Sequence, residues 1–264
     1  MSIKVGIGGW TFEPWRGVFY PPKYPQAREL EYASRQISSI EINGTFYSTQ
    51  KPAAFRKWAD ATPDDFMFSL KASRYAVNRK LLATAGESIE RFVTSGIAEL
   101  KSKLGPILWQ FAETKKFEPV DFTAFLDLLP AEVDGLKLRH AVEPRHDSFR
   151  VPAFIELARA RNVAIVFADS DRYPPIPDLA ADFTYARLQR TAEDIATGYA
   201  AAALDRWADV ARSWEKGGAP DGLPYVHPDQ PKVASRDAFV FFVSGAKVRN
   251  PAAAMALIER LGGR

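Results

Sequence analysis

The chain has 264 residues, 47% of them hydrophobic, which is enough for one domain with a substantial core. It contains no cysteine, which excludes disulfides, thiolate zinc sites and a thiol nucleophile. The 35 Lys and Arg residues against 32 Asp and Glu residues give a net charge of +3, too small to require a polyanionic partner.

Eight apolar runs follow one another along the chain, and almost every one is interrupted near its end by a polar residue. A charged or amide group inside a buried strand costs about 2–7 kcal/mol unless it is paired or faces a polar cavity. The recurrence therefore predicts eight strands that share one polar site. In chain order, the runs are IKVGIGGW, SSIEING, FMFSLKAS, PILWQFAE, LRHAVEPRH, VAIVFADSD, FTYARLQ and FVFFVSG.

Segments with helical spacing lie between these runs, and such alternation is typical of a parallel sheet covered by helices. Eight strands predict a TIM-barrel-like (β/α)₈ fold, with residues 1–264 as a single domain. A doubly wound sheet fits less well because the chain has neither a GxGxxG turn nor a Walker A sequence. The expected helices are Ala27–Gln36, Pro52–Asp60, Gly86–Leu100, Asp121–Leu128, Val151–Arg161, Ala200–Lys216 and Pro251–Leu261.

The polar residues of the strands should meet at one face, because the C-terminal ends of all barrel strands form a single mouth. We therefore expect a binding site there. The alternative is a buried ion-pair network that fixes strand register and binds no ligand. The polar residues are Glu41, Asn43, Lys71, Gln110, Glu143, Arg145, His146, Asp169, Arg187 and Ser244.

Four of these residues are candidates for acid/base catalysis. Glu143 shares strand parity with Ala141, so it should point into the mouth, where a nearby cation would keep it ionised. His146 is the only histidine at a predicted strand end, although a structural capping role is the alternative. Asp169 is a second acid/base candidate, and the alternative is a turn residue. Glu41 is likewise an acid/base candidate with a local structural role as the alternative.

Three cations, Lys71, Arg145 and Arg187, suit an anionic substrate, since guanidinium groups bind phosphate or carboxylate with paired hydrogen bonds. Gln110, Asn43 and Tyr47 are further substrate-binding candidates at the same mouth. As an alternative, the acid/base candidates Glu41, Glu143, His146 and Asp169 could hold Mg²⁺ or Mn²⁺. The three cations argue against a metal, so we expect no cofactor and leave a divalent cation open.

Two loops are expected on opposite faces of the barrel. Gly9–Gln26 follows the first strand and is rich in aromatic residues, so it should cover the catalytic face as a lid or, as we favour, a hydrophobic plug. Gly217–Lys232 precedes the last strand and should lie at the N-terminal face, which makes His227 a poor catalytic candidate.

The segments GIGGWTFEPWRGVFYPP, EINGTFYSTQKP, FMFSLKAS, LWQFAE and VEPRHDSF resemble the YecE-like family, also called domain of unknown function 72. The resemblance implies a TIM-barrel-like fold without an established activity. The chain departs from the family at Gln189 and Arg190, where histidine and glycine are often found, and at Val243 and Ser244, where asparagines are common. The residues that match family motifs are Trp10, Glu41, Asn43, Phe46, Tyr47, Lys71, Gln110, Glu143, Arg145, His146, Ser148, Asp169, Tyr185 and Arg187, so Trp10 and Tyr185 join the substrate-binding candidates.

These features predict an enzyme, either a hydrolase or a lyase, that uses acid/base chemistry on a small or polymeric anionic substrate. One alternative is a metal-assisted phosphoesterase or nucleic-acid-binding protein, in which the aromatic first loop stacks on bases. Another is a non-catalytic ligand-binding protein. No apolar run approaches the length of a membrane span and MSIKVGIGGW lacks a signal-peptide pattern, so we expect a cytoplasmic protein without a membrane partner. The oligomeric state stays open.

Overall fold

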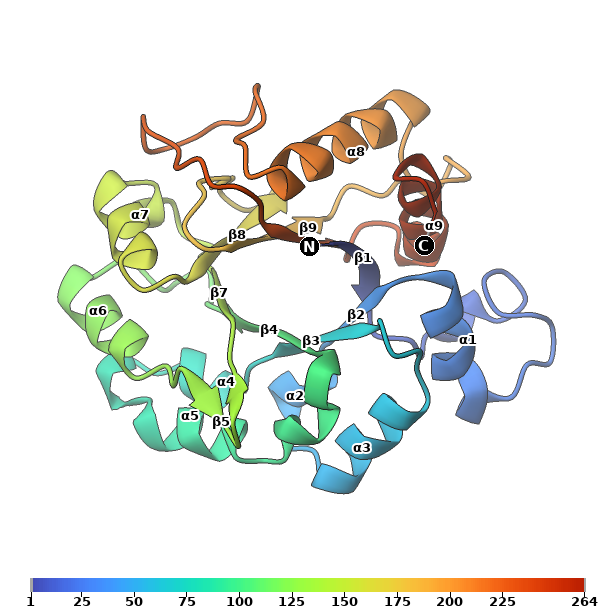
Figure 1. Cartoon of the computed structure of the whole chain (residues 1–264), viewed down its shortest axis with the longest axis horizontal. Coiled ribbons are helices and arrows are strands. Elements are labelled where there is room, and N and C mark those ends of the chain that lie inside the picture. Colours follow the sequence, from blue (N-terminus) through green and yellow to red (C-terminus); the bar gives the residue numbers. More distant parts are fainter. Residues whose placement is uncertain (1, 264) are drawn as a thin grey trace.

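Eight parallel strands close into a barrel in the computed structural model, which describes residues 2–263 (Figure 1). Around the barrel the strand order is β1-β10-β9-β8-β7-β4-β3-β2, so the predicted fold class is confirmed. The short strands β5 (Glu132–Val133) and β6 (Leu136–Lys137) form a separate antiparallel pair. The barrel strands are β1 (Ile3–Gly8), β2 (Ser39–Ile42), β3 (Met67–Lys71), β4 (Leu104–Gln110), β7 (His140–Glu143), β8 (Ala164–Asp169), β9 (Phe183–Leu188) and β10 (Asp237–Phe242).

The barrel closes where β1 pairs with β10 on one side and with β2 on the other. Ile3 pairs with Ala238, and Gly6 pairs with Ser39. A Cβ atom on Gly6 would lie 2.1 Å from the carbonyl oxygen of Ser39. The glycine inside this apolar run therefore allows the close approach of two strand backbones.

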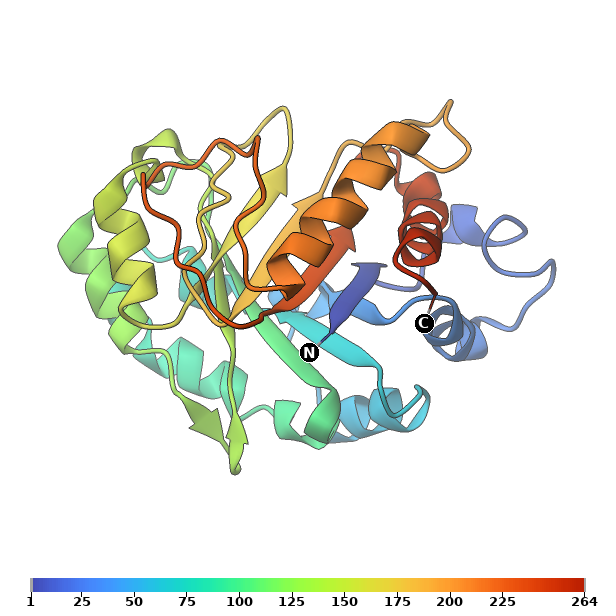
Figure 2. The ribbon, with the colours of Figure 1, turned by 45° about the horizontal axis from the view of Figure 1, so that its top comes forward.

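The helices surround the barrel (Figure 1). Proline lies in the first turn of α3, α6, α7 and α9, where its missing N–H has no partner within the helix. Figure 2 shows α8 and α9 beside one another near the closing strands β10 and β1. The helices are α1 (Glu29–Gln36), α2 (Gly44–Tyr47), α3 (Pro52–Asp60), α4 (Arg74–Val77), α5 (Gly86–Val93), α6 (Pro119–Asp127), α7 (Pro152–Arg159), α8 (Ala201–Glu215) and α9 (Asn250–Arg260).

One predicted helix was wrong in its length. Gly86–Leu100 was expected to be continuous, but α5 ends at Val93 and a 3₁₀ segment, Ile97–Lys103, follows it. Gly96 has a φ of 105°, which an α-helix does not accommodate, so the chain turns there. The one-turn helices α2 and α4, which directly follow β2 and β3, were not predicted.

The hydrophobic core has two parts. One lies between the strands and the helices, and the other fills the barrel interior. In the interior, the rings of Tyr185 and Phe241 pack with their centroids 5.0 Å apart. Apolar side chains fill most of the interior, whereas Lys71, Gln110 and Glu143 are the last residues of their strands. The interior residues are Leu108, Ala141, Ala164, Val166, Ala181, Phe183, Tyr185, Phe239, Phe241 and Val243.

The aromatic loop after β1 packs mainly as a plug. Trp15 and Tyr20 are almost completely buried, and the Trp15 Nε1 donates a hydrogen bond to the Lys247 carbonyl oxygen (2.9 Å) in the connection after β10. The Tyr20 hydroxyl donates to the Trp10 carbonyl oxygen (2.5 Å). These contacts tie the first and last connections of the barrel together on the face where the polar strand ends meet.

Candidate functional site

A cavity of about 630 Å³ opens at the C-terminal ends of the strands. Predicted polar residues from β3, β4 and β9 line it together with residues that follow β1, β2, β7 and β10. Six of the predicted polar residues therefore line one cavity: Asn43, Lys71, Gln110, Arg145, Arg187 and Ser244. The lining residues are Gly8, Gly9, Trp10, Thr11, Ile42, Asn43, Gly44, Gln50, Trp58, Lys71, Gln110, Arg145, Arg187, Val243, Ser244, Lys247 and Asn250.

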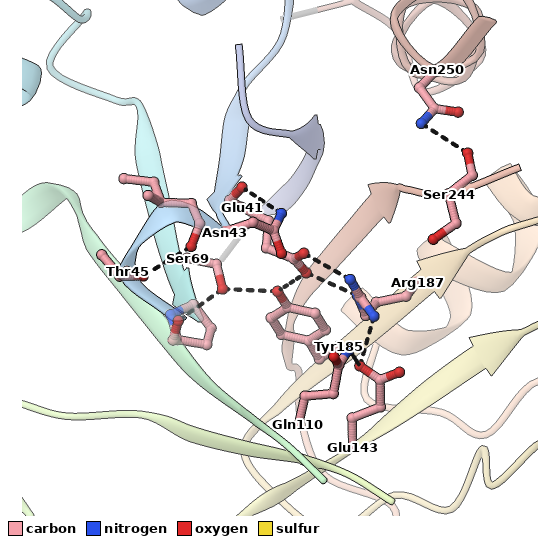
Figure 3. A network of polar contacts seen from close by, with 12 residues as sticks. Glu41, Asn43, Thr45, Ser69, Gln110, Glu143, Tyr185, Arg187, Ser244 and Asn250 are labelled. Atoms are coloured by element: carbon pink, nitrogen blue, oxygen red, sulfur yellow. Dashed lines mark hydrogen bonds and ion pairs between the residues drawn. The ribbon is translucent and has the colours of Figure 1, made fainter. Parts of the chain in front are cut away.

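Arg187 lies at the centre of a buried charge network (Figure 3). Its Nε and Nη2 donate to the two oxygens of Glu41, at 3.0 and 2.9 Å. Its Nη1 donates to Glu143 Oε2 at 2.7 Å. One guanidinium group from β9 therefore bridges carboxylates from β2 and β7, and both carboxylates are fully buried.

Glu143 has two further partners. Gln110 Nε2 donates to its Oε2 at 2.8 Å, and Arg145 Nε donates to its Oε1 at 3.0 Å. Arg145 also donates through Nη1 to the Tyr173 hydroxyl at 3.0 Å and lies over that ring. Burial alone would raise the pKa of Glu143, but Arg187 and Arg145 outweigh it and lower the pKa, so the carboxylate stays ionised.

Tyr185 supports Glu41 from within the barrel (Figure 3). Its hydroxyl donates to Glu41 Oε2 at 2.7 Å and lies 2.8 Å from Ser69 Oγ. Burial and the adjacent carboxylate raise the pKa of Tyr185 well above its usual value, so the phenol remains a donor. Burial by itself would lower the pKa of Arg187, but the two carboxylates reverse this effect and raise it. The guanidinium group therefore stays charged.

Lys71 differs from these residues because its charge has no direct partner. Among the residues that the structure describes, none forms an ion pair with the Lys71 ammonium group or accepts a hydrogen bond from it. Its Nζ lies 4.1 Å from the centroid of the Phe46 ring. The residue is only 8% exposed. Burial, followed by the nearby charge of Arg187, lowers the pKa of Lys71 to about 8.

The other substrate-binding candidates divide into two groups. Trp10 and Asn43 line the cavity, and Asn43 Nδ2 donates to the Glu41 carbonyl oxygen at 3.3 Å. Tyr47 lies outside the cavity wall, is 62% exposed and packs edge-on against Phe46.

Two acid/base candidates lie outside the cavity lining. Asp169 accepts a hydrogen bond from the Tyr199 hydroxyl (3.1 Å) and pairs with Arg190 at 3.3 Å. Burial raises the pKa of Asp169, and Arg190 partly opposes this. His146 Nδ1 accepts a hydrogen bond from the Ser148 amide (3.1 Å), at the start of the 3₁₀ turn Asp147–Phe149. Its contacts are those of the capping alternative.

Sequence reasoning missed two cavity residues that follow β10. Lys247 lies over the Phe12 ring at 4.3 Å. Asn250 Nδ2 donates to the Ser244 carbonyl oxygen at 3.3 Å (Figure 3). Asn250 Oδ1 accepts a hydrogen bond from Thr191 Oγ1 at 2.8 Å. Their position after the last strand was the available signal, but Lys247 begins the short turn Lys247–Arg249 and Asn250 follows that turn, so neither belongs to the apolar run.

The carboxylates and the histidine of the metal alternative do not form one donor set. Arg187 lies between Glu41 and Glu143, whereas Asp169 and His146 have their own partners. Across residues 2–263, no group of three or more Asp, Glu and His side chains is arranged to hold a metal ion.

Within the same range, no helix is both long and apolar enough to cross a bilayer.

Both family departures fall beside this mouth. Arg190 pairs with Asp169 and, at 2.9 Å, with Asp171. Gln189 Nε2 is buried and has no hydrogen-bond partner among the described residues. Ser244 has a φ of 61°, a left-handed conformation that glycine and asparagine adopt more readily than serine. These residues follow the seventh and eighth barrel strands, β9 and β10.

Comparisons with known proteins agree with this architecture. The chain is similar to the UPF0759 protein YecE of Escherichia coli K12, with 28% identity over 142 residues, which are 52% of this chain and 48% of that protein. It thus spans about half the length of this curated relative. A DUF72 family protein of Thermotoga maritima superposes with a TM-score of 0.75 at 21% identity, covering 99% of this chain and 100% of that one. For a DUF72 family protein of Enterococcus faecalis, the TM-score is 0.71 at 16% identity, with 99% and 96% covered. These structures support the fold. The family model described as "Protein of unknown function DUF72" matches residues 4–264, so the chain belongs to the DUF72 family.

Proposed function

We propose that this barrel is an enzyme that binds a small anionic molecule in the cavity at its C-terminal mouth and acts on it by acid/base chemistry. The charge distribution carries the proposal. Arg187 and Arg145 are paired with the carboxylates of Glu41 and Glu143. Two ammonium groups, those of Lys71 and Lys247, line the cavity in addition to these pairs. The excess positive charge favours a phosphate or carboxylate group on the ligand.

The buried network has a supporting role in this proposal. Because Arg187 is held by three hydrogen bonds to carboxylates, its position is set before a ligand arrives. The group suited to proton exchange is Lys71, whose pKa of about 8 lies close to neutral pH. His146 and Asp169, which do not line the cavity, have no direct part in this version of the chemistry.

The experiment is a calorimetric titration with inorganic phosphate and with pyruvate. The wild-type protein is compared with Lys71→Met, Lys247→Met and the control Lys57→Met, whose side chain is exposed on α3. Loss of either cavity cation should weaken anion binding about tenfold or more, equivalent to about 1.4 kcal/mol. Lys57→Met should bind like the wild type. Unchanged binding in both cavity variants, with the fold verified by circular dichroism, would contradict the proposal.

A non-catalytic binding protein is distinguished from an enzyme by what happens to the ligand. A molecule that copurifies with the protein is identified by native mass spectrometry and then incubated with fresh protein. An enzyme converts it to a product, and Lys71→Met slows that conversion strongly. Recovery of the unchanged molecule after prolonged incubation would support binding without catalysis.

A further inference from the structure

Lys71 has the surroundings of a nucleophilic amine. It stands at the end of β3 with its aliphatic stem buried and its Nζ against the face of the Phe46 ring. It also lines the cavity, so a ligand can reach it. The guanidinium groups in the same wall are engaged by carboxylates, and Lys247 is largely exposed. Of these cavity cations, Lys71 alone combines burial with the lack of a direct anionic partner among the described residues.

This environment favours the neutral amine, which is the reactive form. Burial removes water from the ammonium group, and the fixed charge of Arg187 repels it. A lysine in a desolvated pocket beside another cation is a known arrangement for attack on carbonyl carbon. With a pKa of about 8, about one Lys71 side chain in ten is neutral at pH 7.

We propose that Lys71 forms an imine with the carbonyl carbon of an anionic carbonyl compound, either a 2-oxo acid or a phosphorylated ketone or aldehyde. The inference rests on the proposed function, because the same cavity must first bind the anionic group. Lys247 is available for that group from the connection after β10. The carbonyl carbon would then lie beside the end of β3.

The reaction balances without a redox partner. The lone pair of the Lys71 nitrogen forms a bond to the carbonyl carbon, and the electrons of the C=O π bond move to oxygen. After proton transfer from nitrogen to oxygen, the product is a carbinolamine. The nitrogen lone pair then forms the C=N double bond while the C–O bond breaks, and the hydroxyl group leaves as water with the proton that remained on nitrogen. One substrate molecule is bound covalently and one water molecule is released.

Reductive trapping tests this step. Wild-type protein is incubated with sodium cyanoborohydride and with pyruvate, dihydroxyacetone phosphate or acetone, and is then analysed by intact and peptide mass spectrometry. Pyruvate and dihydroxyacetone phosphate separate the two anionic groups, and acetone lacks an anion. We expect one reduced adduct per chain, located at Lys71, with at least one anionic probe, and at least tenfold less adduct with acetone. Lys57→Met should retain the adduct, and Lys71→Met should lose it.

The peptide map of the wild-type protein locates the adduct even if Lys71→Met does not fold. No adduct with either anionic probe, or an adduct spread over exposed lysines, would overturn the imine proposal. If calorimetry detects binding of these probes while trapping fails, anion binding stands and only the imine is wrong. If neither probe binds or reacts, both proposals fail.

Discussion

At the scale of single residues, the charged side chains at the mouth are of two kinds. Some form ion pairs with one another, and one has no direct anionic partner. Arg187 and Arg145 hold Glu41 and Glu143, whereas Lys71 has a ring face and a cavity as its neighbours. The carboxylates nevertheless act on Lys71 at longer range, because both favour its charged form. The pKa of this amine therefore depends on burial first and also on charged residues that do not touch it.

Glu41→Gln tests that long-range effect. The amide keeps the shape of the side chain but removes a negative charge that raises the pKa of Lys71. We expect the pH midpoint for acetylation of Lys71, followed by competitive labelling and mass spectrometry, to fall below the wild-type value of about 8. Glu99→Gln, on the surface, should leave the midpoint unchanged. A midpoint that rises in Glu41→Gln would contradict this account.

Ser244 offers a prediction about stability. Its φ of 61° places a non-glycine residue in the left-handed region. Ser244→Gly should remove this strain and raise the free energy of unfolding by about 0.5–1 kcal/mol, measured by urea denaturation. Ser213→Gly, at a helical position in the last turn of α8, serves as the opposite control and should destabilise the protein. Equal destabilisation by both substitutions would show that Ser244 is not strained.

At the scale of elements, the close packing of β1 against β2 depends on a glycine, which has no side chain. Gly6 lets β1 approach β2 at Ser39, and the same two strands carry Gly8 and Glu41 to the mouth. The backbone contact and the polar site are therefore coupled through these two strands. A change in strand separation at Gly6 should also move the carboxylate that holds Arg187.

Gly6→Ala is expected to destabilise the protein by about 3 kcal/mol, because the new methyl group would overlap the Ser39 carbonyl group. Gly86→Ala is the matched control. Its Cβ would meet only Leu128 at 3.6 Å, and alanine favours the helix that starts there. Thermal and urea denaturation of both variants measure the difference. A Gly6→Ala protein as stable as the wild type would mean that the strands separate at little cost.

Arg236 organises the N-terminal side of the barrel in a different way. Its buried guanidinium group donates to the carbonyl oxygens of Ala181, Gly217 and Pro231 at 3.2, 2.7 and 2.6 Å. Arg236→Met should remove this shared donor, although the Gly217 carbonyl oxygen keeps the Val233 N–H at 3.2 Å, and should cost about 2–4 kcal/mol in unfolding free energy. Proteolysis should then cleave the segment between Gly217 and Pro231 faster. Arg150→Met, at an exposed position after the turn Asp147–Phe149, should change neither measurement by a comparable amount.

At the scale of the whole molecule, the sequence was sufficient to predict the barrel but not how its charges are paired. Eight apolar runs with polar interruptions identify the strands, and parallel topology brings their ends together. The bridge between Glu41 and Arg187 joins residues 146 positions apart, and its geometry depends on the tilt and register of the closed barrel. His146 shows why a local contact can prevail over the expected site. Ser148, only two residues away, lies with its Oγ 2.9 Å from His146 Nδ1.

Acid should weaken the fold through His140 on β7. Its Nδ1 accepts a hydrogen bond from Trp109 Nε1 (3.1 Å), and its Nε2 donates to the Pro130 carbonyl oxygen (2.8 Å). Burial lowers the pKa of His140, although the bond to Pro130 opposes this. The neutral ring therefore stabilises the folded state above the unfolded pKa of about 6.5, and this contribution is lost as the pH falls.

Urea denaturation at pH 7.5 and pH 5 measures this effect. The wild-type protein should lose more stability on acidification than His140→Gln, which cannot titrate at this position. An identical loss in His140→Gln and the wild type would show that His140 has no part in acid sensitivity.

The pairing of Ile3 with Ala238 also has a consequence for biosynthesis. On the ribosome, β1 emerges long before its partner β10 has been translated, so one side of the nascent sheet has no neighbour for most of synthesis. Unpaired strand edges are templates for association with other chains. The polypeptide should therefore depend on a chaperone, or on fast elongation, until its final strand emerges.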